Sequence, residues 1–154
     1  MRKCLYSIII TASCFFLSCS KETVYSKFQP IQNKVWNKQS EYFFMFEISD
    51  ILIPYNIAIQ IRNNDIYPYQ NLWILSEEKQ TDDIFVRDTI EFMLADDFGK
   101  WTGKGISVFQ SHMSLRNNYH FPDTGTYTIG IRHGMRDEKL KGIENIGLII
   151  EKSE

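Results

Sequence analysis

The sequence predicts an all-β protein, an antiparallel β-sandwich of the jelly-roll kind. Short runs of apolar and β-branched residues alternate with polar residues at a period of two, and turn-forming residues separate these runs. No segment longer than about 12 residues has helical periodicity, which disfavours an α/β fold. Many short strands with turns between them are typical of sandwiches and barrels.

The expected strands follow one another from residue 41 towards the C-terminus. The clearest is 56–62, in which three isoleucines alternate with Ala58 and Gln60, as in a half-buried strand. Residues 106–120 fit either a strand or a short helix. Strands are expected over residues 41–48, 56–62, 69–75, 84–94, 126–132 and 146–151, with connections over 49–55, 63–65, 76–83, 95–105, 121–125 and 134–145.

Composition bounds the function without naming it. The chain has 154 residues, of which 44% are hydrophobic, 14% aromatic and 23% charged, and its formal net charge is −2. This length fits one domain, and the mildly acidic balance gives no electrostatic basis for binding nucleic acid. The sequence contains no P-loop, GxSxG or GxGxxG motif, so it has no signature of a nucleotide site or a serine hydrolase.

Residues 1–18 have the features of a lipoprotein signal peptide. Arg2 and Lys3 give a basic start, residues 5–17 are almost wholly apolar or small, and Ser18 precedes Cys19. A diacylglyceryl group attached through the cysteine sulfur is the mark of bacterial lipoproteins. We therefore expect Cys19 to carry lipid, palmitate included, and to anchor the chain to a membrane. The alternative is an ordinary signal peptide with an incidental cysteine.

Cleavage after residue 18 defines the remaining organisation. The other two cysteines lie in the segment that is removed, so no internal disulfide is expected and the core must provide the stability. Residues 19–40 are predicted to hold the lipidated Cys19, a polar tether and a possible first strand. Residues 41–154 are predicted to form a single β-sandwich domain.

Three groups of short motifs have a distinctive order and spacing. The first is RNNDIYPYQNL at 62–72, the second is DTIE at 88–91 with ADDFGKWTGKG at 95–105, and the third is FP at 121–122, GTY at 125–127, GMR at 134–136, GI at 142–143 and IGLIIEK at 146–152. Together with the lipoprotein signal, they resemble the gliding motility lipoprotein family GldH of the Bacteroidetes, over about residues 24–152.

That resemblance implies a non-enzymatic lipoprotein of the cell envelope, anchored in the outer membrane by its N-terminal lipid. It also implies a role in gliding, a motility linked to the type IX secretion machinery, with envelope proteins of that apparatus as partners. No cofactor is implied, and a small-molecule ligand is not expected.

The candidate partner-binding residues are Arg62, Tyr67, Tyr69 and Arg136. They are residue types that anchor protein interfaces, and they lie near predicted turns where a rigid sandwich displays side chains. The competing hypothesis for Tyr67 and Tyr69 is that they cover an edge of the sandwich and belong to its core.

A metal site is not indicated. The histidines His112, His120 and His133 have no HxxxH or HxH spacing, and the loop that starts at Asp96 lacks the alternating and twelfth-position ligands of an EF-hand. We expect a hairpin or bulge there instead, in which glycines let Trp101 lie across a neighbouring strand.

The aromatic residues support one alternative function, a carbohydrate-binding module at the cell surface. Trp36, Trp73 and Trp101, with eight tyrosines, are enough for a sugar-stacking platform on one face of a sandwich. The competing hypothesis is that most of these rings are core; it is favoured for Trp101, whereas Trp73 fits either orientation.

Overall fold

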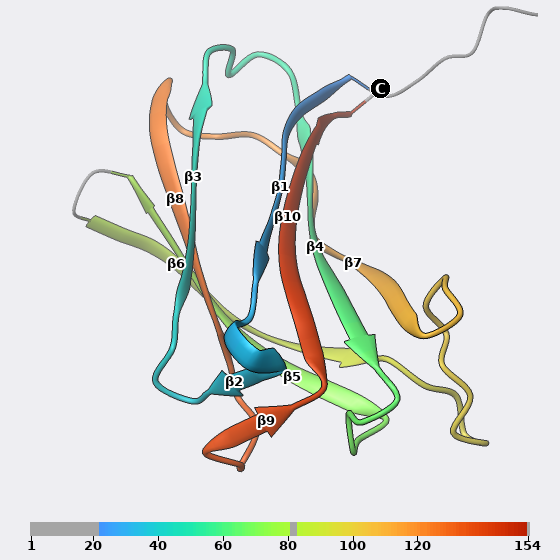
Figure 1. Cartoon of the computed structure of the whole chain (residues 1–154). Coiled ribbons are helices and arrows are strands. Elements are labelled where there is room, and N and C mark those ends of the chain that lie inside the picture. Colours follow the sequence, from blue (N-terminus) through green and yellow to red (C-terminus); the bar gives the residue numbers. More distant parts are fainter. Residues whose placement is uncertain (1–21, 81–82, 154) are drawn as a thin grey trace, which may run out of the picture.

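Eight long strands form two antiparallel four-stranded sheets in the computed structural model, which describes residues 22–80 and 83–153 (Figure 1). The first sheet contains, in spatial order, β1 (Thr23–Pro30), β10 (Ile143–Lys152), β4 (Tyr55–Asn64) and β7 (Val108–Tyr119). The second sheet contains β3 (Tyr42–Ile48), β8 (Gly125–His133), β5 (Asn71–Gln80) and β6 (Asp83–Met93). The predicted antiparallel β-sandwich is confirmed.

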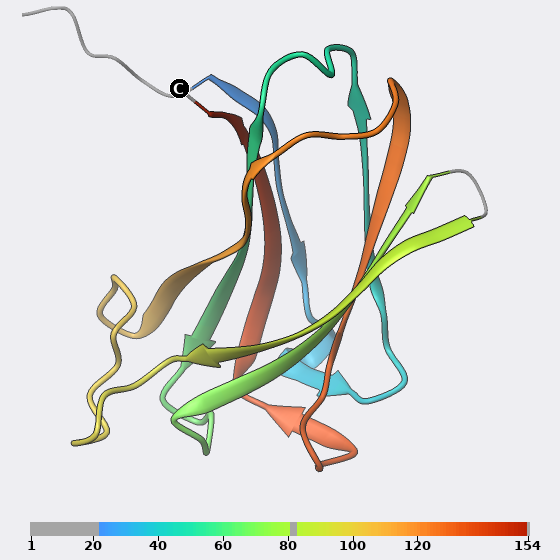
Figure 2. The same ribbon diagram turned by 180° about the vertical axis from the view of Figure 1, so that it is seen from behind.

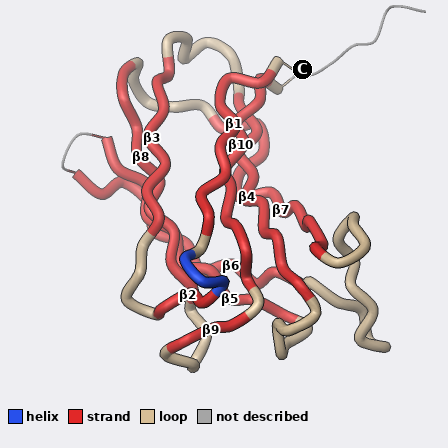
Figure 3. The backbone as a smooth tube through the Cα atoms, viewed as in Figure 1, coloured by secondary structure: helices blue, strands red, loops and turns tan. Residues whose placement is uncertain are grey.

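The path of the chain is that of a jelly roll. Successive long strands alternate between the two sheets, and only the β5–β6 hairpin stays within one of them, as the view from behind makes clear (Figure 2). The short pair β2 (Val35–Asn37) and β9 (Lys139–Lys141) closes one end of the sandwich. In the described part of the chain, helical structure is limited to η2 (Gln32–Lys34), and strand dominates the backbone (Figure 3). This double-sheet topology agrees with the jelly-roll prediction.

The core lies between the two sheets. On β4 and β10, every second side chain points inward and is fully buried, and the same alternation occurs on β3, β5 and β8. Near the chain termini, an aromatic cluster surrounds Phe121, whose ring centroid lies 4.6 Å from that of Tyr127 and 4.9 Å from that of Tyr119. The buried residues of this core include Phe44, Phe46, Ile48, Ile57, Ile59, Ile61, Leu72, Ile74, Phe92, Tyr127, Ile129, Ile131, Ile146, Leu148 and Ile150.

The structure corrects the predicted turn at 63–65. Asn63 and Asn64 are the last residues of β4, and both are buried. The Asn64 amide accounts for this, because its Nδ2 donates to the Glu144 carboxylate and its Oδ1 accepts from the Ile66 backbone N–H, at 2.9 and 3.0 Å. The chain therefore turns only after Asn64.

The charged loop predicted at 76–83 is also wrong, because β5 continues to Gln80. Its charged residues alternate: Glu77 points outward and pairs with Arg87 on β6 at 3.1 Å, whereas Glu78 points inward and is buried. Tyr119 donates a hydrogen bond of 3.2 Å to the Glu78 carboxylate, and burial raises the pKa of that group. Partners on neighbouring strands thus take the place of the water that would solvate these two carboxylates in a loop.

The structure decides between the two alternatives for residues 106–120, which contain the strand β7 and no helix. One further expectation is revised. The strand expected at 56–62 is buried on both faces rather than one, since Ala58 and Gln60 on its outward face are only 6% and 8% exposed. β4 lies between β10 and β7, so outward side chains of its neighbours cover it.

The N-terminal part of the described chain belongs to the first sheet. The range 19–40, expected to hold a tether and a possible first strand, contains β1, which pairs with β10 from Thr23 opposite Glu151 to Pro30 opposite Asn145. The signal peptide and Cys19 lie outside the described residues. Within the described ranges, no helix has the length and apolar character needed to cross a membrane.

His133 is predicted to make the fold sensitive to acid. Its side chain is 1% exposed against Trp36, and burial lowers its pKa below the ordinary value. In the unfolded chain the His133 imidazole binds a proton below about pH 6.5, whereas in the folded chain it stays neutral at that pH. The free energy of unfolding therefore falls as the pH drops through that value, by up to about 1.4 kcal/mol per pH unit.

Urea unfolding at pH 7.5 and 5.5 tests this prediction. We expect His133→Gln to lose less stability on acidification than the parent chain, because it has no buried group to protonate. The exposed His112 provides the matched control, since His112→Gln should keep the parental pH dependence. An unchanged pH dependence in His133→Gln would contradict the assignment.

Candidate functional site

A shallow groove lies on the second sheet where β5 begins and β8 has just ended. The chain after β8 stays beside β5 here, because the Gly134 N–H donates to the Trp73 carbonyl at 2.7 Å and the Trp73 N–H lies 3.3 Å from Met135 Sδ. The groove has a volume of about 390 Å³ and is lined by Tyr69, Asn71, Trp73, Gly134, Met135 and Arg136. We call it the β5–β8 groove.

Its aromatic rings are displayed rather than buried. The side chains of Tyr69 and Trp73 are 37% and 38% exposed, and Arg136 is exposed beside them. Tyr69 is held in place by a hydrogen bond of 2.7 Å from its hydroxyl to Asp137 Oδ2, which raises the pKa of the phenol. A glycine at position 134 is favoured because a Cβ there would come within 3.3 Å of the Trp73 Cβ. The groove therefore offers fixed, partly apolar anchors.

The four predicted partner-binding residues do not form one patch. Tyr69 and Arg136 line the β5–β8 groove, but Arg62 lies on the outward face of the first sheet. Its guanidinium lies 3.8 Å from the centroid of the Phe28 ring and donates to Gln110 at 2.9 Å. Strand register separates these residues, which proximity to turns could not reveal.

Tyr67 is not an exposed anchor. It is 3% exposed, its hydroxyl donates to the Asn71 carbonyl at 2.6 Å, and its ring lies edge-on to Tyr69 at 5.9 Å. Burial raises the pKa of this phenol well above its ordinary value. The hypothesis that it belongs to the core is therefore correct for Tyr67, which supports the groove from below.

Two side chains of the groove, Trp73 and Met135, were not among the predicted partner-binding residues. Met135 lies in the connection predicted at 134–145, and only its contact with the Trp73 backbone reveals that it lines the groove. Trp73 carried a usable signal, because it lies between the apolar Leu72 and Ile74. Both neighbours are fully buried, so the alternation of a strand turns Trp73 outward.

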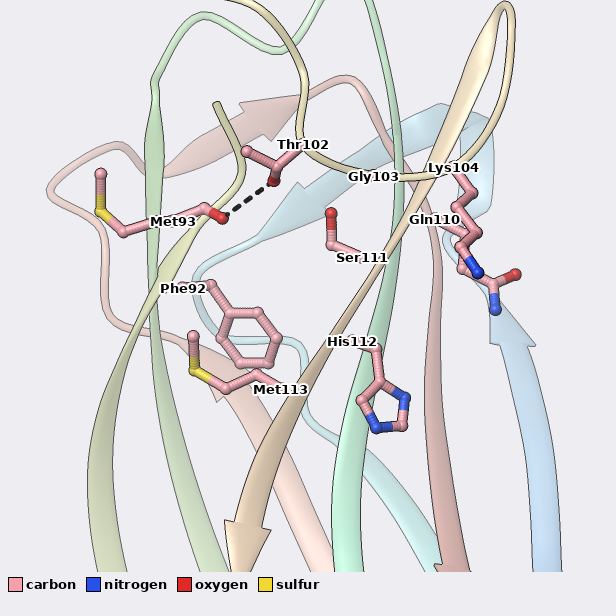
Figure 4. A pocket seen from close by; sticks show the side chains of 9 residues that line it. All are labelled: Phe92, Met93, Thr102, Gly103, Lys104, Gln110, Ser111, His112 and Met113. Atoms are coloured by element: carbon pink, nitrogen blue, oxygen red, sulfur yellow. Dashed lines mark hydrogen bonds between the residues drawn. The ribbon is translucent and has the colours of Figure 1, made fainter. Parts of the chain in front are cut away.

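A larger cleft opens between β6 and β7, the last strands of the two sheets on this side (Figure 4). Its volume is about 670 Å³, and Figure 4 shows the Phe92 ring and the Met113 side chain on its inner side. At its mouth, Thr102 Oγ1 donates to the Met93 carbonyl at 3.3 Å. The lining residues are Phe92, Met93, Thr102, Gly103, Lys104, Gln110, Ser111, His112 and Met113.

This cleft does not assemble a nucleophile. Ser111 and His112 are adjacent on one strand, so their side chains point to opposite faces and cannot hydrogen-bond as a catalytic pair. Across residues 22–80 and 83–153, no three His, Cys, Asp or Glu side chains are grouped as a metal site.

The acidic loop before this cleft has a local structural role. Asp96 Oδ1 accepts hydrogen bonds from the Phe98 and Lys100 backbone N–H groups at 3.0 and 2.9 Å, which closes a tight turn. The turn ends a small hairpin in which Ala95 pairs with Trp101. The Trp101 ring lies against Phe109 of β7, at 5.9 Å, so the expectation that it crosses a neighbouring strand is confirmed.

The three tryptophans are dispersed. Trp36 is fully buried, Trp101 is partly buried against the core, and only Trp73 presents an exposed face. A sugar-stacking platform built from all three tryptophans is therefore not formed.

Comparison with known proteins gives consistent results. The family model described as GldH lipoprotein matches residues 23–150. The chain is 32% identical to the "Gliding motility lipoprotein GldH homolog" of Christiangramia forsetii, over 96% of this chain and 94% of that protein. It is 25% identical to the "Gliding motility lipoprotein GldH" of Flavobacterium johnsoniae, over 96% of each.

One solved structure, described as "Structure of infectious bursal disease virus Gx strain", is similar over 85% of this chain and 30% of the viral chain. The sequence identity is 11% and the TM-score is 0.34, which is too low to indicate a common function.

The two neighbouring tyrosines of the groove are predicted to differ sharply in their contribution to stability. Tyr67→Ala leaves a cavity in the core and should cost about 3–5 kcal/mol of unfolding free energy. Tyr69→Ala removes a partly exposed ring and should cost less than about 1 kcal/mol. Urea unfolding measures both values, and Tyr67→Phe, which removes only the hydroxyl, should fall between them. Equal losses for the two alanine variants would contradict the assignment of Tyr67 to the core.

Proposed function

The chain belongs to the GldH lipoprotein family, and we propose that it is a lipid-anchored component of a gliding apparatus that acts through protein contacts. The family match covers residues 23–150, and the two relatives named as gliding motility lipoproteins align with nearly the whole chain. The proposed location is the outer membrane, and the proposed partners are envelope proteins of the gliding and type IX secretion machinery.

Attachment through Cys19 is the first part of the proposal. The sequence of Ser18 and Cys19 after an apolar stretch supports it, as do the names of the relatives. In this proposal, residues 1–18 are the signal peptide, and residue 19 carries the lipid at the start of the mature chain.

The second part concerns the contact surface, and the position of the β5–β8 groove is the observation that carries it. β1 begins at one end of the sandwich, whereas β5 begins and β8 ends at the other (Figure 1). An anchor attached just before β1 thus holds the groove away from the membrane, where a partner can reach it.

The side chains in the groove suit such a contact. Tyr, Trp, Met and Arg are enriched in protein interfaces. Among them, Tyr, Trp and Arg contribute most often to the binding free energy. Tyr69, Trp73, Met135 and Arg136 bring these types together around one concave surface. Trp73 is fixed by strand pairing on β5, the segment after β8 is held to it by the Gly134 N–H bond to the Trp73 carbonyl, and the Tyr69 hydroxyl is bonded to Asp137, so little ordering cost is expected on binding.

Cys19→Ser is predicted to release the protein from the membrane. The full chain would be expressed in a gliding member of the Bacteroidetes and located by cell fractionation, because lipidation requires the thiol. Cys14→Ser, within the segment to be removed, should remain in the membrane fraction as the matched control. A membrane-bound Cys19→Ser protein would contradict the proposed anchor.

Trp73→Ala combined with Arg136→Ala is predicted to impair gliding without a loss of protein. The test requires a host that lacks its own copy of the gene and glides when the parent chain restores it. Met45→Ala with Arg132→Ala, exposed positions on the outward face of the same sheet, is the control and should leave gliding intact. Full gliding by a stable groove variant would exclude the groove as the contact surface.

A further inference from the structure

We propose that the β3–β4 loop, residues 49–54, is a second membrane contact that inserts Leu52 into the lipid surface beside the N-terminal anchor. The inference rests on the proposed lipidation of Cys19. It adds a function that neither the anchor nor the β5–β8 groove provides, because it fixes how the domain stands on the membrane.

The loop lies at the end of the sandwich where the described chain begins. The Ser153 N–H donates to the Pro54 carbonyl at 2.8 Å, and the Lys152 N–H donates to the Glu22 carbonyl at 2.9 Å. Two hydrogen bonds through the C-terminal residues therefore connect the loop to the start of the chain. Figure 1 shows the loop between β3 and β4 at the same end as the beginning of β1.

Leu52 projects from this loop as an isolated apolar side chain. It is 86% exposed, whereas its neighbours Ile51 and Ile53 pack partly buried against the core. Burying both neighbours leaves Leu52 at the apex, pointing away from the domain. Because Leu52 lies at the end of the sandwich nearest the proposed lipid anchor, the membrane is the apolar phase within its reach.

The apex is held firmly. Asp50 Oδ1 accepts a hydrogen bond from the Leu52 backbone N–H at 2.8 Å, and the Tyr55 hydroxyl donates to the Asp50 carbonyl at 2.7 Å. The His120 ring nitrogen Nδ1 lies 3.3 Å from the Ile51 carbonyl, which braces the loop from the neighbouring connection. Because the loop backbone is already fixed by these hydrogen bonds, little conformational entropy is lost when Leu52 inserts into the membrane.

Chain length identifies lipid as the occupant. Four residue steps separate Cys19 from Thr23, and each extended step spans at most about 3.6 Å, so the start of β1 lies within about 14 Å of the lipidated residue. A single helix with its side chains is already about 10–12 Å wide. No folded domain fits between this end of the sandwich and the membrane, and the lipid headgroup region is what the loop meets.

Local charge permits the approach. Glu22, which directly precedes β1, and Lys152 neutralise each other in an ion pair of 2.6 Å. The Asp50 carboxylate is turned back onto the loop backbone. The contact is therefore apolar, and we expect it to depend weakly on salt and on the fraction of anionic lipid.

The unusual cysteine content of the chain allows a direct test. Cys19 is consumed by lipid and the earlier cysteines are removed, so Leu52→Cys would be the sole free thiol of the mature chain. The lipidated variant would be labelled with a thiol-reactive, polarity-sensitive fluorophore. It would then be placed in phosphatidylethanolamine–phosphatidylglycerol vesicles with and without brominated acyl chains.

Brominated lipid should quench the label at position 52 by about twofold or more, because bromine acts only on fluorophores that reach the acyl region. The matched control is Ile66→Cys, another exposed apolar position, 67% exposed, in the β4–β5 connection at the opposite end of the sandwich. Its label should show no quenching. Equal quenching at the two positions, or none at position 52, would overturn the inference.

Vesicle flotation separates this result from a failure of the proposed function. Protein that floats with the vesicles and shows no quenching at position 52 would overturn the loop contact and leave the anchor intact. Protein that does not float would overturn the lipid anchor and the loop contact together.

Discussion

The pairing of β1 with β10 is the constraint on which the arrangement of this protein depends. It joins the first and last strands of the chain in one sheet, so the start and the end of the described chain lie at the same end of the sandwich. Packing reinforces the pairing, because the Phe28 ring lies so close to Gly147 that a Cβ there would approach it to 2.7 Å, and the Arg62 guanidinium lies 3.8 Å from the centroid of the same ring. Every other feature is placed relative to this end: the β3–β4 loop beside it and the β5–β8 groove opposite.

Sequence periodicity predicted most of the fold, and it failed where charge and pairing compete. The alternation in β4 and β8 is simple because the inward row of each strand is mainly aliphatic or aromatic, and the buried polar side chains Asn63 and His133 come only near its end. Around Glu77 and Glu78 the same alternation exists, but both partners of the charges, Arg87 and Tyr119, come from other strands. Such compensation is non-local, so a polar stretch looks like a loop until its neighbours are known.

The candidate site was predictable only in part, for a related reason. Tyr69 and Arg136 were recognised by residue type, yet nothing in their spacing indicates that they meet across β5 and the end of β8. Arg62 is of an equally suitable type and lies on the other sheet. Tyr67 and Tyr69 are only two positions apart, yet their environments differ. The Tyr67 ring is buried in the core, whereas the Tyr69 ring is partly exposed. Residue type identifies candidates, and strand register decides which of them share a surface.

The sandwich also acts as a spacer of fixed height. β4 and β10 each contain ten residues and run the length of the first sheet, and a strand rises about 3.3 Å per residue, so the β5–β8 groove stands about 30 Å from the end at which the proposed anchor attaches. In the proposed attachment through Cys19, only a few residues join that end to the lipid, so the height would hardly vary. A partner with its own membrane attachment would then have to present its matching surface at the same distance from the bilayer, which excludes proteins held much nearer to it or farther from it.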